Sequence, residues 1–168
     1  MQLILTAIGD DRPGLTKALA DAIADAGGNW LESQFSTLGG YYVGSVLVEL
    51  PDERLDGLKT AVREIDASGF SIEVQPLAET HEPTHSRAFC FDLVASDRPG
   101  IVREVSTAIA ELGASIDELE TGTETEAWSG QTMFRARVCV AVPDGMSAEK
   151  VRDKLEEISG EMMVDIED

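Results

Sequence analysis

The hexapeptide "DDRPGL" at residues 10–15 returns as "SDRPGI" at residues 96–101. A motif repeated within one chain indicates a structural unit that is used more than once. The same offset of 86 residues aligns the "AIA" of 22–24 with that of 108–110, and Gly27 with Gly113. Apolar residues at helical spacing follow both tetrapeptides, so the repeated unit includes a helix directly after the motif.

The offset grows further along the chain, where "LPD" at 50–52 matches "VPD" at 142–144. The second copy therefore carries six extra residues. They fall most naturally in "ETEAWSG", residues 124–130, at the tip of an expected hairpin.

Each copy predicts the element order β-α-β-β-α-β. In the first copy we expect strands at 2–8, 29–37, 41–50 and near 70–76, with helices at 13–26 and 55–65. In the second we expect strands at 87–94, 115–123, 131–142 and 162–166, with helices at 99–112 and 147–158. This order predicts an α+β protein of two ferredoxin-like units, each an antiparallel four-stranded sheet with both helices on one face. The expected domains are 1–76 and 87–168, joined by the polar linker 77–86.

A unit of this size buries a modest core, and its sheet keeps one uncovered face and free edges. We therefore expect two units to pair, within the chain or between chains, and a homo-oligomer fits this need. The sequence leaves the choice of partner unit open.

The chain has 32 acidic and 13 basic residues among 168, a formal net charge of −19. Such a surface repels phosphate backbones and anionic lipids, so we expect no direct nucleic-acid binding and no membrane association. The N-terminus lacks the basic region of a signal peptide, and no apolar run approaches the roughly 20 residues of a membrane span. We expect a cytoplasmic protein.

The cysteines, Cys90 and Cys139, lie in the apolar runs "FCF" and "VCV". We interpret them as inert core thiols that form neither a disulfide framework nor a metal site. His81 and His85 in the linker lack further ligands, so we expect no metal and no cofactor. No nucleophile–base set, Walker loop or Rossmann fingerprint is visible, which predicts a non-enzyme.

The two tryptophans and the acidic second hairpin leave two questions open. Trp30 and Trp128 are each either buried core residues or exposed interface anchors. The acidic stretch 117–128 favours a solvated, partner-facing hairpin over a cation site, and Arg135 and Arg137 are placed to pair with Glu118 and Glu120 across the sheet.

The repeated tetrapeptide joins the first strand of each copy to its first helix. Pro13 and Pro99 suit a first helical turn, and Gly14 and Gly100 remove a Cβ where a backbone or ligand could approach. Asp11 and Asp97 could accept N–H bonds at the helix start or an ammonium group, while the N–H groups there suit a carboxylate. A zwitterion matches this corner, although good turn and capping chemistry needs no ligand.

Two βαββαβ units, each opening with "DRPG" followed by Leu or Ile and later by "AIA" and Gly, resemble tandem ACT domains. The resemblance covers nearly the whole chain and extends to the family of glycine cleavage system transcriptional repressors. It implies a small amino acid, glycine or serine, bound where the first loop of one domain faces the second strand of a partner domain. The positions that match are Asp11, Arg12, Pro13, Gly14 and Asn29 in the first copy and Asp97, Arg98, Pro99, Gly100 and Ser115 in the second. The first copy keeps the Asn that such domains often carry at the second strand.

The resemblance implies a regulator that acts on a separate DNA-binding protein through protein contact, in agreement with the acidic charge. Two other functions remain open. One is a structural interaction module without a ligand, and the other is a regulatory subunit of an amino-acid metabolic enzyme.

Overall fold

A computed structural model describes residues 1–66, 69–77 and 87–167. The chain divides into two compact units, Met1–His81 and Glu82–Asp168, which are described separately. His81, His85 and the rest of the expected linker after Leu77 lie outside the described residues.

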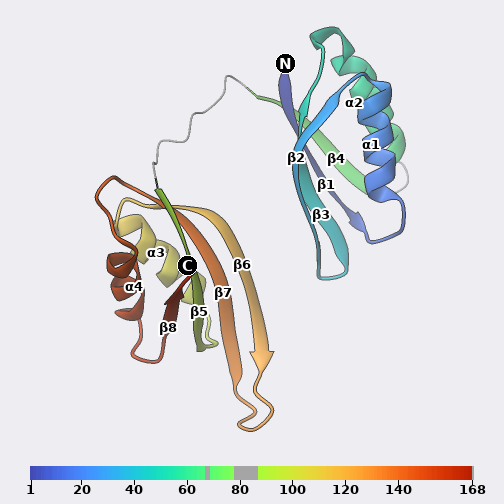
Figure 1. Cartoon of the computed structure of the whole chain (residues 1–168). Coiled ribbons are helices and arrows are strands. Elements are labelled where there is room, and N and C mark those ends of the chain that lie inside the picture. Colours follow the sequence, from blue (N-terminus) through green and yellow to red (C-terminus); the bar gives the residue numbers. More distant parts are fainter. Residues whose placement is uncertain (67–68, 78–86, 168) are drawn as a thin grey trace. The chain divides into compact units, whose positions relative to one another are not determined.

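Unit 1 contains the expected elements in the expected order (Figure 1). They are β1 (Gln2–Asp10), α1 (Leu15–Asp25), β2 (Asn29–Leu38), β3 (Tyr41–Glu49), a 3₁₀ turn (Asp52–Arg54), α2 (Leu55–Asp66) and β4 (Phe70–Pro76). The antiparallel sheet has the strand order β2-β3-β1-β4, and both helices cover the same face.

Unit 2 repeats this topology with the strand order β6-β7-β5-β8. Its elements are β5 (Arg87–Ser96), α3 (Ile101–Glu111), β6 (Ser115–Thr125), β7 (Thr132–Val142), α4 (Ala148–Glu156) and β8 (Met163–Ile166). Even a local irregularity recurs: the register shifts between Trp30 and Glu32 in β2 and between Ile116 and Glu118 in β6. The predicted α+β fold of two ferredoxin-like units is confirmed.

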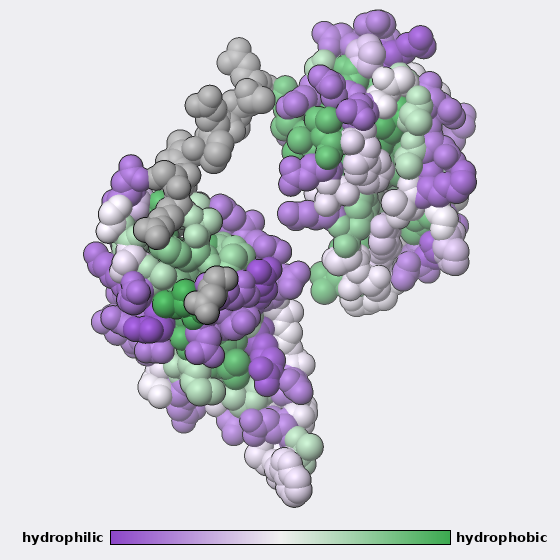
Figure 2. All heavy atoms as spheres, in the orientation of Figure 1, coloured by the Kyte–Doolittle hydropathy of each residue, from purple (hydrophilic) through white to green (hydrophobic). Residues whose placement is uncertain are grey.

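Alternation along the central strands places the core of each unit on the helix side of its sheet. Leu3 and Leu5 of β1 are fully buried beside Leu19 and Ile23 of α1. In unit 2, Phe91 and Leu93 of β5 occupy the equivalent buried positions in the core. The opposite face of each sheet has no helix over it, and we call it the open face. In the view of Figure 2, hydrophilic side chains dominate the surface of both units.

The six extra residues extend the β6–β7 hairpin, which runs past the end of its sheet (Figure 1). A network of hydrogen bonds orders the tip: the Glu126 N–H donates to the Gln131 carbonyl, and the Gly130 N–H to the Glu126 carbonyl, both at 2.9 Å. Trp128 at this tip is fully exposed, whereas Trp30 is half-buried against the core of unit 1. Trp128 is therefore an exposed residue and Trp30 a core residue.

The helix start differs from the expectation. Both first helices begin two residues later than the motif suggested, at Leu15 and Ile101, with Gly14 and Gly100 as their N-caps. Pro13 and Pro99 thus precede the cap instead of occupying the first turn. The glycines adopt left-handed backbone angles (φ 96° and 92°), which turn the chain from strand to helix at a place where other residues are strained.

The interpretation of the cysteines as inert core thiols is wrong. Cys90 in β5 and Cys139 in β7 form a disulfide. Their register pairing places them directly opposite each other on adjacent strands. Both side chains lie on the open face, opposite to the buried Phe91 and Val138, so neither belongs to the core cluster.

Candidate ligand-binding corners

The two "DRPG" motifs form matching corners, one at the end of each unit's first strand. In unit 1, residues 11–14 are exposed and Leu15 is the first buried residue. No side chain caps α1 or α3, so the first N–H groups of both helices lack a side-chain acceptor at the cap. These N–H groups, at the positive end of a helix dipole, are suited to a carboxylate.

The glycine of each corner is needed for its backbone angle. A Cβ built on Gly14 would meet no atom within 4 Å, and one on Gly100 would meet only the Arg103 guanidinium at 3.5 Å. Within each described unit no backbone crowds the missing Cβ, and the approach of another backbone or a ligand to this place stays a prediction. The positive φ alone accounts for glycine at these positions.

The aspartates do not cap the helices, contrary to one of the two roles expected for them. The Thr37 hydroxyl of β2 donates to the Asp11 carboxylate at 3.4 Å. Asp97 uses its backbone N–H, which donates to the Thr132 carbonyl at 3.0 Å. Both carboxylates are exposed, and this exposure is compatible with the other expected role, that of an acceptor for an ammonium group.

Arg98 is fixed within its own unit. Its guanidinium donates two hydrogen bonds to the Glu104 carboxylate, one of them at 2.7 Å from Nη1 to Oε1. These bonds lower the pKa of Glu104 and raise that of Arg98. The position that matches Glu104 in unit 1 is Ala18, so Arg12 cannot form the same ion pair. The two corners thus share a backbone and differ in the residue at the position of Glu104.

The structure places Asn29 and Ser115 far from the corners of their own units. Asn29 pairs with Glu49, which pairs with Gln2 at the opposite end of β1 from Asp10. Because β1 has nine residues, its two ends are separated by roughly 26 Å. Ser115 lies likewise opposite Ala141 and Ala88, far along the sheet from Ser96. Within one unit the expected site residues are therefore not brought together.

Three hollows occur elsewhere in the units. A hollow of about 440 Å³ lies between α3 and α4, lined by Glu104, Glu111 and Lys154 among others. Two more, of about 320 and 630 Å³, lie on the open faces of the first and second sheets. None of these three is lined by an aspartate, proline or glycine of the corners.

The sequence predicted only part of the ion pairing of Arg135 and Arg137. Arg137 pairs with Glu118 at 3.6 Å, as expected, but Arg135 pairs with Glu124 at 2.8 Å. The strongest partner of Arg137 is Glu167, whose carboxylate accepts two hydrogen bonds at 2.6 and 2.7 Å and whose pKa they lower. The position of Glu167 just after the short strand β8 gave no pattern from which this pair could be predicted.

The comparisons with known proteins agree with this architecture. ACT-domain profiles match residues 1–75 and residues 91–160. A search of the curated proteins finds no match. A structure of an unknown protein from Galdieria sulphuraria is similar over 99% of this chain and 96% of its own, with 28% identity and a TM-score of 0.79.

A second solved structure, described as that of a candidate glycine cleavage system transcriptional repressor, has a TM-score of 0.72. It is 15% identical over 99% of this chain and 95% of its own, which shows a shared fold. In the described residues no helix is long and apolar enough to cross a membrane. With a profile match in each repeated unit and the same βαββαβ topology in both, the chain belongs to the ACT-domain family and consists of two ACT domains in tandem.

Proposed function

We propose that this protein is a non-enzymatic, amino-acid-responsive regulator, similar to the glycine cleavage system repressors, that acts through protein contact in the cytoplasm. Its ligand is a small amino acid, glycine or serine. The observation that carries the proposal is the duplicated corner, in which a left-handed glycine exposes an uncapped helix start next to a solvent-exposed aspartate.

In this proposal the helix-start N–H groups donate hydrogen bonds to the ligand carboxylate, and Asp11 or Asp97 accepts hydrogen bonds from its ammonium group. Asn29 or Ser115 is supplied by a second ACT unit, because each lies at the wrong end of its own sheet. The ligand thus requires paired units and shifts the equilibrium toward the pairing that it fits. A homo-oligomer is one way to provide the second unit.

The corner of unit 1 is the stronger candidate of the two. Asn29 reaches further than Ser115, and its amide carries the donor and the acceptor on separate atoms. We therefore assign the ligand first to Asp11, Arg12, Pro13, Gly14 and Asn29.

Titration calorimetry with glycine, serine and the other common amino acids tests the ligand. We expect saturable binding and a rise in melting temperature with glycine or serine. Asp11→Ala should weaken binding at least tenfold, and Asp97→Ala, its matched control, should weaken it less. A folded protein that gives no response to any amino acid at millimolar concentration would rule out the sensing function.

The proposed partner is a protein, since the net charge of −19 disfavours direct contact with nucleic acid. The ordered tip of the β6–β7 hairpin presents Trp128 to solvent, and exposed tryptophans commonly anchor interfaces. We propose that this tip contacts a DNA-binding regulator. Trp128→Ala should reduce retention of that regulator on the immobilised chain, whereas Leu38→Ala, at the exposed hairpin end of unit 1, should not.

The structural alternative has one observation in its favour, because the positive φ of Gly14 and Gly100 explains both glycines without any ligand. A purely structural module would lose stability in corner variants and show no amino-acid response. The other alternative is a regulatory subunit of an amino-acid metabolic enzyme. Mass spectrometry of the retained partner distinguishes it, because the partner would then be a metabolic enzyme and not a transcription factor.

A further inference from the structure

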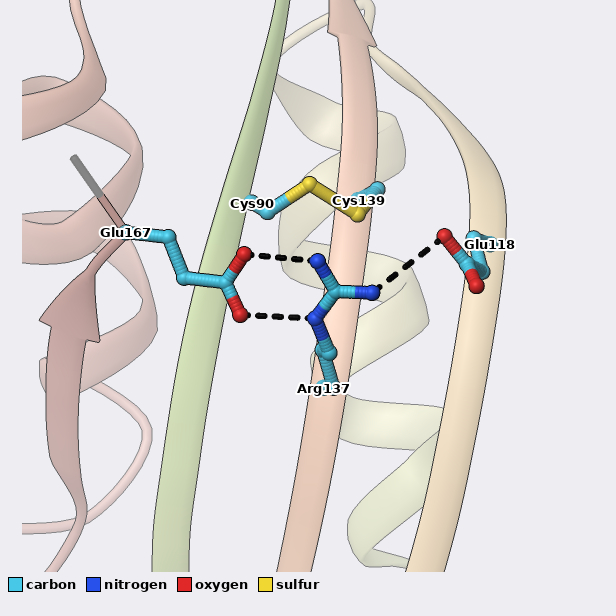
Figure 3. The surroundings of a disulfide bond; sticks show 5 residues. All are labelled: Cys90, Glu118, Arg137, Cys139 and Glu167. Atoms are coloured by element: carbon cyan, nitrogen blue, oxygen red, sulfur yellow. Dashed lines mark hydrogen bonds and ion pairs between the residues drawn. A yellow bond between two sulfur atoms is a disulfide. The ribbon is translucent and has the colours of Figure 1, made fainter.

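The Cys90–Cys139 disulfide lies on the open face of the second sheet. Figure 3 shows it spanning the two central strands, with the helix behind the sheet and the sulfur atoms in front. The Cα atoms are 4.0 Å apart, the spacing of a pair that exchanges no backbone hydrogen bonds. In agreement, the Cys90 carbonyl accepts its hydrogen bond from the Glu167 N–H on the other side. Cys90 is half-buried and Cys139 is 8% exposed, so Cys90 is the more accessible cysteine of the pair.

The topology of the unit does not require this cross-link. The repeat aligns Cys90 with Ile4 and Cys139 with Leu47, and these two residues form the corresponding register pair between β1 and β3. Unit 1 therefore builds the same sheet with two aliphatic side chains at this place. The buried core cluster of unit 2 likewise contains neither cysteine.

Charged side chains surround the disulfide, and carboxylates outnumber guanidinium groups among them. Arg137 lies between Glu167 and Glu118 and is paired with both (Figure 3). In the same row of the sheet, Asp92 and Glu120 stand on either side of Arg137. The local field is therefore negative, which repels an anionic thiolate and attracts a cationic thiol.

We propose that Cys90 and Cys139 form a reversible thiol–disulfide exchange site, whose co-reactant is a low-molecular-weight thiol or its disulfide. A thiolate attacks one sulfur, the protein S–S bond breaks, and a mixed disulfide forms while the other cysteine leaves as a thiolate. A second thiolate then attacks the small-molecule sulfur of the mixed disulfide and releases the remaining cysteine as a thiolate. Overall, two thiols are oxidised to one disulfide, and the protein gains two electrons and two protons.

This assignment is independent of amino-acid binding by the corners. Disulfides in reducing compartments are usually transient and regulatory, and a disulfide that the fold does not need fits that role. The same place holds the end of the chain, since Glu167 contacts both Cys90 and Arg137. Oxidation thus ties together the two strands on which the C-terminal segment rests.

The first test equilibrates the full-length chain in glutathione buffers of increasing reduced-to-oxidised ratio, followed by acid quench, alkylation and mass measurement. We expect no alkylated cysteine in oxidising buffer and two in reducing buffer, and the number should return to zero on re-oxidation. The circular dichroism should stay unchanged throughout. Thiols that become available only when the protein is unfolded by urea would overturn the proposal. Loss of secondary structure on reduction would overturn it as well.

The second test measures the rate of reduction by cysteamine, which is cationic, and by 2-mercaptoethanesulfonate, which is anionic. The matched control carries Cys90→Ser and Cys139→Ser together with Ile4→Cys and Leu47→Cys. Both pairs have carboxylates in the flanking strands, Glu32 and Glu73 at the control pair and Glu118 and Asp165 at the native pair. The two pairs differ at Thr6, Ser45 and Gln34, where the native pair has Asp92, Arg137 and Glu120.

We expect the ratio of cysteamine rate to sulfonate rate to be several-fold higher at the native pair than at the control pair. The excess should shrink at about 0.5 M salt, where the Debye length falls to only a few ångströms. Because each ratio compares the same two reagents, their intrinsic reactivities cancel. Equal ratios at the two pairs would overturn the inferred selection for cationic thiols.

Discussion

Replacing both cysteines by alanine should destabilise unit 2 and leave unit 1 unchanged. The disulfide joins residues separated by 49 positions in the sequence. Closing a loop of that length removes about 14 cal/mol/K of entropy from the unfolded chain, or roughly 4 kcal/mol at 25 °C. Measured values commonly fall below this figure, so we expect a loss of about 2 to 4 kcal/mol.

In a unit of this size, such a loss lowers the melting temperature by about 10 to 25 °C. Calorimetry of the full chain should then show the unfolding transition of unit 2 at a lower temperature than that of unit 1. In a Trp128→Phe background, Trp30 is the remaining tryptophan and reports on unit 1, because it packs against that core. Its fluorescence transition should stay where it is in the disulfide-bonded protein.

Reduction of the unmodified chain provides a second measurement, since it breaks the cross-link without removing side-chain atoms. Reduced protein and the double alanine variant should agree within about 1 kcal/mol. A double variant that melts within about 2 °C of the oxidised protein would refute the loop-closure reasoning. A shift of the Trp30 transition would refute the independence of unit 1.

Three further predictions, the first with a matched control, test the local geometry. Gly14→Ala places a side chain at φ 96° and should cost about 1 to 2 kcal/mol in urea unfolding, whereas Gly57→Ala within α2 should stabilise by about 0.5 to 1 kcal/mol. Gly44→Ala would put a Cβ 2.3 Å from the Gln34 carbonyl oxygen and Phe35, so it should cost about 3 kcal/mol or more by the same measurement; a cost below about 1 kcal/mol would contradict the close packing seen there. Glu167→Gln should lower stability at neutral pH, because the hydrogen bonds from Arg137 hold the pKa of Glu167 below its ordinary value. That difference should be present above the ordinary carboxyl pKa and vanish as the pH falls through the lowered one; a difference independent of pH would contradict the pairing.

Much of the fold could be predicted because its information is local. Periods of 2 and 3.6 residues identify strands and helices within a few residues of each other in sequence, and the repeat then gives each assignment a second, independent copy. The start of the helix at Leu15, two residues after the expected Pro13, escaped this reasoning. A proline suits a first turn, but the left-handed glycine after it delays the helix to Leu15.

The candidate site could be predicted only in part. The sequence identifies the corners as a repeated element, and the helix between the first two strands already predicts that Asn29 lies at the far end of the sheet from Asp11. The exact partners across the sheet follow only from the register, in which Asn29 pairs with Glu49 and Asp10 with Tyr41. The ion pair of Arg98 with Glu104 likewise depends on how the corner folds back on its helix.

The sequence by itself determined that this protein is one βαββαβ unit used twice, with an acidic surface and a longer second hairpin. Only the tertiary structure decided that Cys90 meets Cys139 and that Glu167 meets Arg137. An alternating pattern shows which residues share a face, but not which residue of another strand stands opposite. These two contacts join residues 49 and 30 positions apart in the sequence, and the periodicity of either segment carries no information about their alignment.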